Sequence, residues 1–266
     1  MPETNALTLC SRVWSDTLLP APFRAAFSAR EGGASSGAYN SNNMALHVGD
    51  DPRRVRENRR DLLQNFNLDP NRAIVAEQIH GSSAVLVDEA DAGSGCFSHK
   101  DSIAATDALI TATPGLPLLC MSADCLLLAL CEPQARLVAV VHAGWRGLAE
   151  GVIESTIKLM KESGAKPGLI TAAGTPSIGP CCFEVGPEVV SALGDEHAAF
   201  SLDGKVSYDL RAAARARLLK AGLSAGQIQI DRACTCCRED MFFSHRRTTK
   251  LGSTHTGRMG LLVWID

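Results

Sequence analysis

Residues 137–148 read LVAVVHAGWRGL, and they set the interpretation of the whole chain. The apolar run 137–141 suits a strand that is buried on both faces of a sheet. His142 follows directly, and Trp145 and Arg146 then lead into an amphipathic segment. A histidine at the end of a core strand needs a reason, and we interpret it as part of a metal-centred active site.

Further strands and helices are predicted on both sides of this stretch. Residues 116–121 and 125–130 are also near-continuous apolar runs, and Cys125 begins the second one. Over 147–163, apolar residues recur at helical spacing, and Gly164 ends the pattern. The other predicted strands are 7–14, 23–30, 73–79, 83–87, 107–111, 169–173, 227–230 and the C-terminal LLVWI, and the other predicted helices are 52–66, 187–193 and 209–221.

Strands and helices are mixed along the whole length, without an internal repeat or a linker. Such a mixture is typical of one α/β or α+β domain, which we expect to occupy residues 1–266. A chain of 266 residues with 45% hydrophobic residues is long enough to bury one large core.

The composition excludes several classes of protein. A net charge of -3 gives no support for nucleic-acid binding, which needs a basic face. No signal peptide is visible at the N-terminus, and no apolar run approaches the roughly 20 residues that span a bilayer. We therefore expect a cytoplasmic monomer with no nucleic-acid or membrane partner. In that compartment the ten cysteines should be reduced, as core thiols or metal ligands.

His80, Cys125 and His142 are the sharpest candidates for chemistry, because each lies at or beside an apolar strand. Two imidazoles and one thiolate could hold zinc and leave its fourth position open for water or substrate. The intervals of 45 and 17 residues, however, match no short metal motif. From the residues alone, a core cysteine with two satisfied histidines therefore stays an open alternative.

Other chemical signatures are weak or absent. The sequence has no phosphate-binding P-loop, no G-x-G-x-x-G and no H-E-x-x-H motif. Residues 33–37 match G-x-S-x-G, but loop-like residues follow where a nucleophile elbow needs a helix. Cysteines at 181–182 and 234–237 could form a second zinc site. We do not expect one, because adjacent cysteines on an extended chain point to opposite faces.

A series of short motifs lies between about residues 23 and 266. They are REGGASSGAYNSNN with HVGDDP and ENRR, then EQIHG, DALIT, SADC, VVHAGWRGL, IGPCCFEVGPEV, and CT with FFSHRR and GRMG. In this order they resemble the YfiH family, also called the laccase-domain or multicopper polyphenol oxidase family. The chain departs from the family where SADC continues with two leucines instead of proline. It departs again where the tail has CTCC instead of a single cysteine.

The resemblance implies a fold and a ligand set. The fold would be a single-domain, layered α-β-β-α structure with mixed sheets, related to bacterial toxin deamidases. The histidine of the HG motif, the cysteine of ADC and the histidine of HAGW would hold zinc, with copper as the other metal. These ligands fall on His80, Cys125 and His142.

The resemblance also implies purine nucleoside phosphorylase activity on adenosine, inosine, guanosine and methylthioadenosine, together with adenosine deaminase activity. The partners would then be a nucleoside and phosphate. Asn43 in the glycine-rich loop could line the nucleoside site. Arg146, beside the predicted helix N-terminus at Gly147, is a phosphate-binding candidate, as are Arg59 and Arg258, with Arg246 and Arg247 as further candidates.

Three alternatives remain. Cys125 with a histidine base could hydrolyse an amide, for example in peptidoglycan editing. Copper-dependent phenol oxidation is disfavoured, because only seven histidines are present and no H-x-H pair occurs among them. The third alternative is a binding protein that holds metal without turnover.

Overall fold

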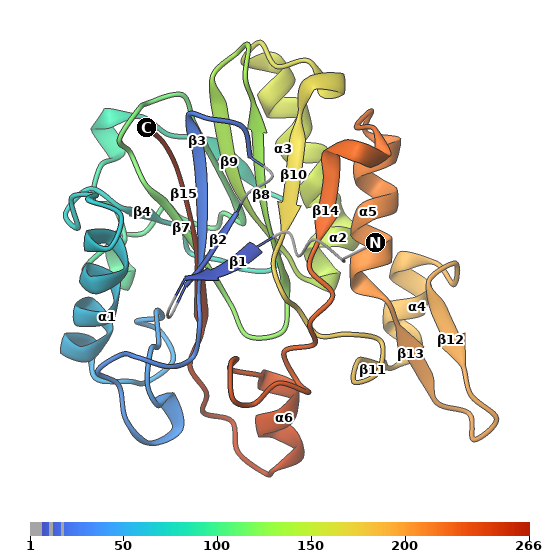
Figure 1. Cartoon of the computed structure of the whole chain (residues 1–266). Coiled ribbons are helices and arrows are strands. Elements are labelled where there is room, and N and C mark those ends of the chain that lie inside the picture. The colour runs from blue at the N-terminus through green and yellow to red at the C-terminus, as the bar shows by residue number, and fades with distance from the viewer. Residues whose placement is uncertain (1–6, 11–12, 17–18) are drawn as a thin grey trace.

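The computed structural model describes residues 7–10, 13–16 and 19–266, and Figure 1 shows two sheets with helices on their outer faces. The first sheet has the order β1 (Leu7–Cys10), β2 (Val13–Asp16), β3 (Phe23–Ser28), β15 (Met259–Ile265), β7 (Leu118–Ser122) and β4 (Ile74–Val75). The second has the order β14 (Ile228–Ile230), β10 (Thr171–Gly174), β8 (Leu126–Glu132), β9 (Leu137–Ala143), β6 (Ala108–Thr111) and β5 (Ala84–Leu86). Both sheets are mixed, since β4 and β7 pair in parallel in one, and β5 and β6 in the other.

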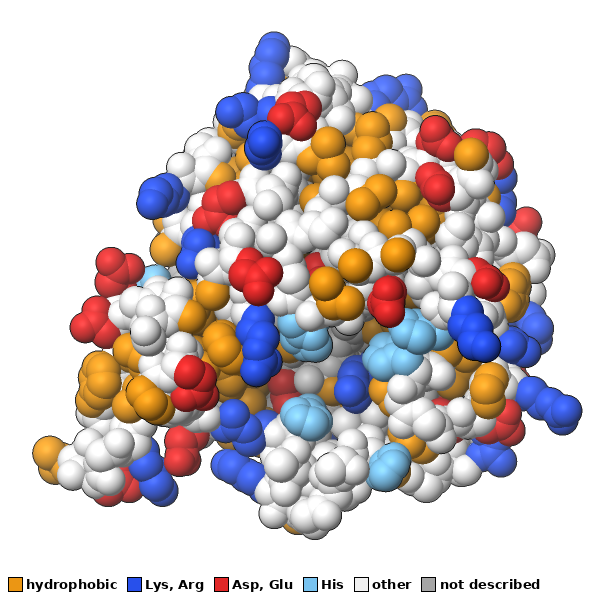
Figure 2. All heavy atoms as spheres, turned by 180° about the vertical axis from the view of Figure 1, so that it is seen from behind, with side chains coloured by type: hydrophobic (Ala, Val, Ile, Leu, Met, Phe, Trp, Pro, Cys, Tyr) orange, Lys and Arg blue, Asp and Glu red, His pale blue; other side chains and the backbone are white. Residues whose placement is uncertain are grey.

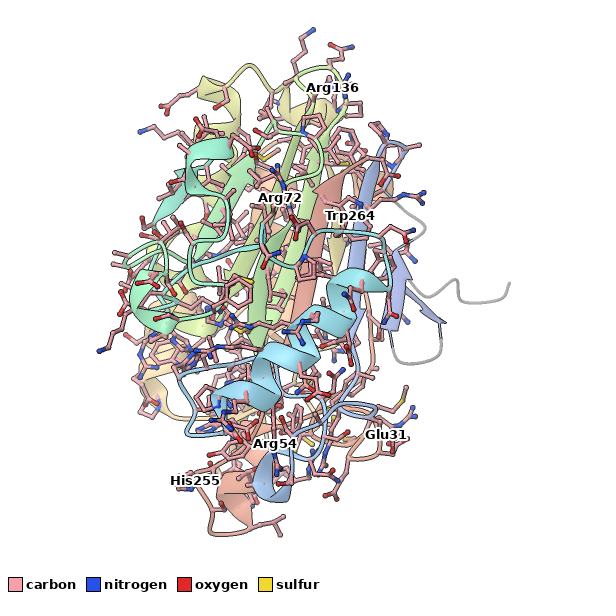
Figure 3. All side chains as sticks on the ribbon, turned by 90° about the vertical axis from the view of Figure 1, so that its left-hand side faces the viewer. Glu31, Arg54, Arg72, Arg136, His255 and Trp264 are labelled. Carbon is pink, nitrogen blue, oxygen red and sulfur yellow. The ribbon has the colours of Figure 1, made fainter. Side chains whose placement is uncertain are left out.

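Three apolar cores separate the layers. Between the sheets, Phe27 of the first sheet packs with Leu127 and Val140 of the second. On the outer face of the first sheet lies helix α1 (Pro52–Gln64), which buries Leu63 in a core that also contains Trp264 (Figure 3). On the outer face of the second sheet lie α3 (Val152–Glu162) and α5 (Leu210–Lys220). The predicted α-β-β-α fold is therefore confirmed.

β9 occupies the centre of the second sheet and is buried along its full length, as its apolar sequence predicts. It pairs antiparallel with β8 on one side and β6 on the other. In this register His142 lies opposite Leu127, and Val141 lies opposite Ala108. The strand end that carries His142 therefore meets the residues just before β8 and β6.

The segment after β9 forms two helices rather than the single helix predicted for 147–163. α2 (Trp145–Glu150) ends and α3 begins at Gly151, which has a φ of +89°. A left-handed residue of this kind closes one helix and redirects the chain, and glycine adopts it without a steric penalty. The helix also starts two residues earlier than predicted, which places Arg146 in its first turn.

The other elements complete the frame. α4 (Pro187–Leu193) was predicted, whereas α6 (His245–Lys250) was not. A small third sheet contains β11 (Glu184–Val185), β13 (Val206–Tyr208) and β12 (Ala198–Phe200). Among the described residues, no helix is long and apolar enough to cross a bilayer. Short 3₁₀ turns occur at Gly37–Tyr39, Glu89–Asp91, His99–Asp101, Pro167–Leu169 and Ala225–Gln227.

Arg59 of α1 connects this helix to neighbouring loops. Its side chain is buried, and its guanidinium donates hydrogen bonds to the carbonyl oxygens of three loop residues. The acceptors are Met44 O at 2.7 Å, Gly95 O at 2.9 Å and Cys96 O at 2.7 Å. These carbonyls occupy the donors that a phosphate would need, so the structure argues against the predicted phosphate-binding role of Arg59.

Replacing Arg59 by alanine should therefore destabilise the fold. Three buried carbonyl groups would lose their donors, and a cavity would remain under α1. We expect the free energy of unfolding to fall by about 3 kcal/mol, measured by urea denaturation. The exposed neighbour Arg60 is the matched control, and R60A should change stability by less than about 0.5 kcal/mol. Equal stability of R59A and wild type would contradict this account.

Candidate metal centre

A buried carboxylate organises the end of the second sheet. Asp107 precedes β6 and is almost fully buried. Its oxygens accept hydrogen bonds from three successive backbone N–H groups, those of Ile79 at 3.1 Å, His80 at 3.0 Å and Gly81 at 2.8 Å. Oδ1 also lies 2.8 Å from Nδ1 of His142. One carboxylate therefore positions both candidate histidines.

The carboxylate of Asp107 holds the loop at His80 in an uncommon conformation. His80 has a φ of +63°, in the left-handed region that side chains with a Cβ rarely adopt. Such a residue costs about 1–2 kcal/mol, so surrounding contacts must hold it in place. The three N–H bonds to Asp107 supply those contacts and fix the position from which the imidazole projects.

Three side chains then converge. The donor atoms of His80, Cys125 and His142 all lie within 4.8 Å of one another, and we call these residues the candidate metal centre. The two imidazole rings meet edge to face, with 4.7 Å between their centroids. A Cβ at Gly144 would lie 3.1 Å from the sulfur of Cys125 and 3.2 Å from the ring of His80. Glycine in the HAGW motif thus leaves room for the three groups to approach.

The electrostatics favour a thiolate at Cys125. Burial raises the pKa of this thiol, but hydrogen bonds and charge from His142 and His80 outweigh burial and lower it to about 6. Burial likewise lowers the pKa of His142, yet Asp107 and Cys125 outweigh it and raise that pKa to about 9. The lowered pKa of Cys125 and the raised pKa of His142 favour a thiolate–imidazolium pair at neutral pH.

The donor set fits a metal ion with an open coordination position. Asp107 occupies Nδ1 of His142, so Nε2 is the nitrogen left for ligation. A carboxylate that orients a ligating histidine in this way is a common partner in zinc sites. Two imidazoles and one thiolate make three ligands, as in catalytic zinc centres. His142 is buried while His80 is exposed, so the centre is accessible from one side.

A cavity of about 450 Å³ lies over this accessible side. Figure 2 shows histidine and basic side chains gathered around a hollow on this face of the molecule. Besides the candidate metal centre, its lining includes His47, Gln78, Trp145, Arg146, Phe183, His245, Arg246 and Arg258. An arrangement of candidate metal ligands, histidines and arginines around one hollow suits a small, polar or anionic substrate.

The arginines on the cavity wall differ in how many hydrogen bonds their guanidinium groups already make. Arg146 lies over the Trp145 ring at 4.3 Å and forms no hydrogen bond or ion pair with any described residue. Arg258 Nη1 donates to Thr256 O at 2.9 Å and Gly257 O at 3.1 Å. Arg246 Nη1 likewise donates to two backbone carbonyls, those of Cys182 at 3.0 Å and Glu184 at 2.8 Å. Arg146 is therefore the wall residue best able to receive an anion.

Asn43 supports the site without lining it. Its amide donates to Ala45 O at 3.1 Å and to Asp50 Oδ2 at 2.9 Å. Its Oδ1 accepts from the backbone N–H of Arg258 at 2.9 Å. Asn43 is fully buried and lies outside the cavity lining, so the structure argues against the predicted nucleoside contact. It instead helps to position Arg258.

The sequence alone did not single out Asp107 and Asp124 as site residues. Asp124 immediately precedes Cys125 and is buried with a φ of +92°. Its carboxylate accepts from Thr235 Oγ1 at 2.6 Å, Ser244 Oγ at 3.0 Å and Arg246 N at 2.7 Å. Their positions in the sequence could have identified them, because each aspartate lies in a short motif next to a buried strand.

Comparison with known proteins identifies the family. The family model described as "Multi-copper polyphenol oxidoreductase laccase" matches residues 24–266. The purine nucleoside phosphorylase YlmD of Geobacillus stearothermophilus is 36% identical over 88% of this chain and 87% of its own. The adenosine deaminase RL5 of an unknown prokaryotic organism is 36% identical over 83% of this chain and 87% of its own.

Solved structures agree with these sequence matches. The crystal structure of YfiH from Bacillus licheniformis superposes with a TM-score of 0.94 at 30% identity, covering 98% of this chain and all of that one. The structure of YlmD from Geobacillus stearothermophilus gives a TM-score of 0.93 at 33% identity, covering 98% and 99% of the two chains. The chain therefore belongs to the YfiH family, whose family model bears the description multi-copper polyphenol oxidoreductase laccase.

Proposed function

We propose that this protein is a zinc-dependent purine nucleoside phosphorylase that also deaminates adenosine. The observation that carries the proposal is the convergence of His80, Cys125 and His142 beside a 450 Å³ cavity. The cavity falls within the roughly 300–1,000 Å³ range of small-molecule sites. The names of the relatives, purine nucleoside phosphorylase and adenosine deaminase, support a purine nucleoside as substrate.

For deamination, His80, Cys125 and His142 would hold the ion through two nitrogens and one sulfur. Zinc bound there would supply a polarised water whose oxygen adds to C6 of adenosine, and the bond from C6 to the amino nitrogen would then break to release ammonia. Asp107 keeps the proton on Nδ1 of His142, which leaves Nε2 unprotonated toward the metal side. The backbone N–H of His80 donates to the Asp107 carboxylate at 3.0 Å, which holds His80 beside His142.

Phosphorolysis needs a second set of contacts. Phosphate attacks C1′ of the ribose, the bond from C1′ to the purine nitrogen breaks, and the purine leaves with that electron pair. Arg146 is the best-placed phosphate ligand, because its guanidinium borders the cavity without an ionic partner. Arg258, which borders the same cavity, would add positive charge beside the leaving group or the phosphate.

A cysteine hydrolase is the second candidate, because the pKa shifts of Cys125 and His142 favour an ion pair between them. Thiolates paired with imidazolium are the nucleophiles of cysteine hydrolases. That activity would survive removal of the metal by a chelator and would form a covalent adduct on Cys125. Copper-dependent phenol oxidation would instead require copper in the purified protein.

Purified protein with known metal content should convert adenosine to inosine without phosphate, and release adenine when phosphate is added. H142A should lose the metal and both activities by at least about 100-fold, because it removes one of three ligands. Chromatography of the products and elemental analysis on the same sample provide the measurement. H255A removes an exposed histidine outside the cavity and is the control. Full turnover by metal-free H142A would exclude the metal mechanism.

Replacing Asp107 by asparagine should weaken the metal site without removing a ligand. An amide nitrogen cannot accept the N–H bonds that Asp107 receives, so both histidines lose their common anchor. We expect the metal affinity to fall about 10- to 100-fold, measured by competition with a chromogenic chelator. D101N, at an exposed aspartate, is the matched control. Unchanged affinity in D107N would show that the carboxylate does not position the ligands.

Replacing Arg146 by alanine should separate the two activities. Loss of a charged contact to phosphate should raise KM for phosphate about tenfold, while deamination, which uses no phosphate, should keep its rate within about twofold. Initial rates at varied phosphate concentration give the first value, and inosine formation without phosphate gives the second. R53A, an exposed arginine on α1, serves as the control. An equal loss of both activities would assign Arg146 to the nucleoside instead.

A further inference from the structure

A second group of four cysteines converges away from the candidate metal centre. The sulfur atoms of Cys181, Cys182, Cys234 and Cys237 all lie within 4.8 Å of one another, and we call these residues the cysteine cluster. Cys237 Sγ lies 3.6 Å from Cys181 Sγ and 3.4 Å from Cys182 Sγ. All four are free thiols in the structure.

A tight turn allows the two adjacent cysteines to face the same point. The carbonyl oxygen of Gly179 accepts hydrogen bonds from the backbone N–H groups of Cys182 and Phe183, each at 3.0 Å. The chain at 179–183 is therefore a turn and not an extended segment. This geometry removes the reason for expecting Cys181 and Cys182 to point to opposite faces.

The second pair has the spacing of a metal-binding turn. Cys234 and Cys237 are separated by two residues, which is the C-x₂-C interval of structural zinc sites. The N–H of Gly179 points at Cys234 Sγ, 3.1 Å away. A Cβ at Gly179 would lie 3.3 Å from both Cys181 Sγ and Cys234 Cβ. The backbone N–H of Gly179 therefore reaches the sulfur of Cys234. A larger residue at position 179 would crowd the cysteine cluster.

Charge and anchoring around the cluster also suit a bound ion. Four thiolates around Zn²⁺ leave a net charge of minus two, which nearby cations can offset. Arg246 Nη1 donates to Cys182 O at 3.0 Å, and Arg247 Nη1 donates to Cys236 O at 3.1 Å. The two loops are joined directly as well, because Thr235 N donates to Ser177 O at 3.1 Å. Arginines therefore brace both sulfur-bearing loops.

We propose that the cysteine cluster is a structural zinc site with four thiolate ligands. Binding would exchange the four thiol protons, released to solvent, for one Zn²⁺, with no change of oxidation state. With Zn–S bonds of about 2.3 Å, tetrahedral ligands lie about 3.8 Å apart, close to the sulfur distances observed. Four protein ligands leave no open position, so this ion would be structural, and it is independent of the proposed catalytic activity.

The position of the cluster explains what such an ion would stabilise. It joins the loop before β11 to the segment before α6. That second segment contains Thr235, whose hydroxyl binds Asp124, the residue next to Cys125. The first loop contributes Ile178 and Phe183 to the cavity wall. Zinc in the cluster would hold together two chain segments that border the cavity.

The test starts from the full-length double variant Cys125→Ser/His142→Ala, which lacks two ligands of the candidate metal centre. Purified with reductant and supplied with zinc, it should retain about one zinc per chain by elemental analysis. Adding Cys237→Ser should lower the zinc content about tenfold and reduce the melting temperature. Adding Cys236→Ser, at the neighbouring cysteine outside the cluster, should leave the zinc in place.

Cobalt gives a second measurement that does not require cluster variants to fold. Bound to the double variant, cobalt(II) should show the visible bands of tetrahedral coordination and the near-ultraviolet charge transfer of thiolate ligands. In wild-type protein, zinc should protect the cluster cysteines from alkylation, as mapped by mass spectrometry. A folded, reduced double variant that binds neither ion would overturn the proposal. A Cys181–Cys237 or Cys182–Cys237 disulfide trapped by acid alkylation of whole cells would overturn it too.

Discussion

The carboxylate of Asp107 is the constraint on which the rest of the site depends. A buried, ionised carboxylate is costly unless its oxygens are hydrogen-bonded, and here three backbone N–H groups and one imidazole meet that need. These bonds lower the pKa of Asp107 although burial alone would raise it. Because the donors come from the His80 loop and from β9, satisfying one charge brings two distant chain segments together. The position of the candidate metal centre is thus set by a group that would not itself touch the ion.

The sheets make this arrangement rigid. β9 is flanked by β8 and β6, and apolar side chains cover both of its faces. His142 therefore sits on a strand that cannot shift its register without exposing a whole row of core residues. Cys125 precedes the neighbouring strand, and Asp107 precedes the strand on the other side. The three functional groups therefore lie at the same end of three adjacent strands. There the chain leaves the apolar core, and polar side chains are tolerated.

Local patterns predicted the long, buried strands well, but they did not predict which distant segments lie side by side. The apolar runs at 116–121, 125–130 and 137–141 are strands in the structure, because burial on both faces leaves an unmistakable composition. The convergence of His80 and His142 depends on pairing between segments tens of residues apart, which no local pattern reports. The resemblance to a family supplied the three candidate ligands, whereas the supporting role of Asp107 became visible only with the hydrogen bonds.

Several positions in the structure differ from what the sequence suggests, for related physical reasons. Arg59 and Asn43 are polar residues whose hydrogen-bonding groups are used by nearby backbone or side chains, and composition cannot tell a buried structural group from one that binds substrate. The helix predicted over 147–163 splits because Gly151 takes a left-handed conformation that the apolar periodicity does not reveal. At Cys181 and Cys182, an assumed extended backbone gave the wrong side-chain directions. In each case, backbone geometry or hydrogen bonding that a local pattern does not report decided the outcome.

The place of the last strand has a consequence for biosynthesis. β15 lies between β3 and β7, so the first sheet cannot close until residues 259–265 have been synthesised. Ser244 and Arg246, which bind Asp124 beside Cys125, also come from this late part of the chain. A nascent chain therefore presents Cys125 and both histidines before the scaffold around them is closed. The frame around the candidate metal centre is therefore completed only when residues 244–265 have been synthesised and have folded onto the earlier strands.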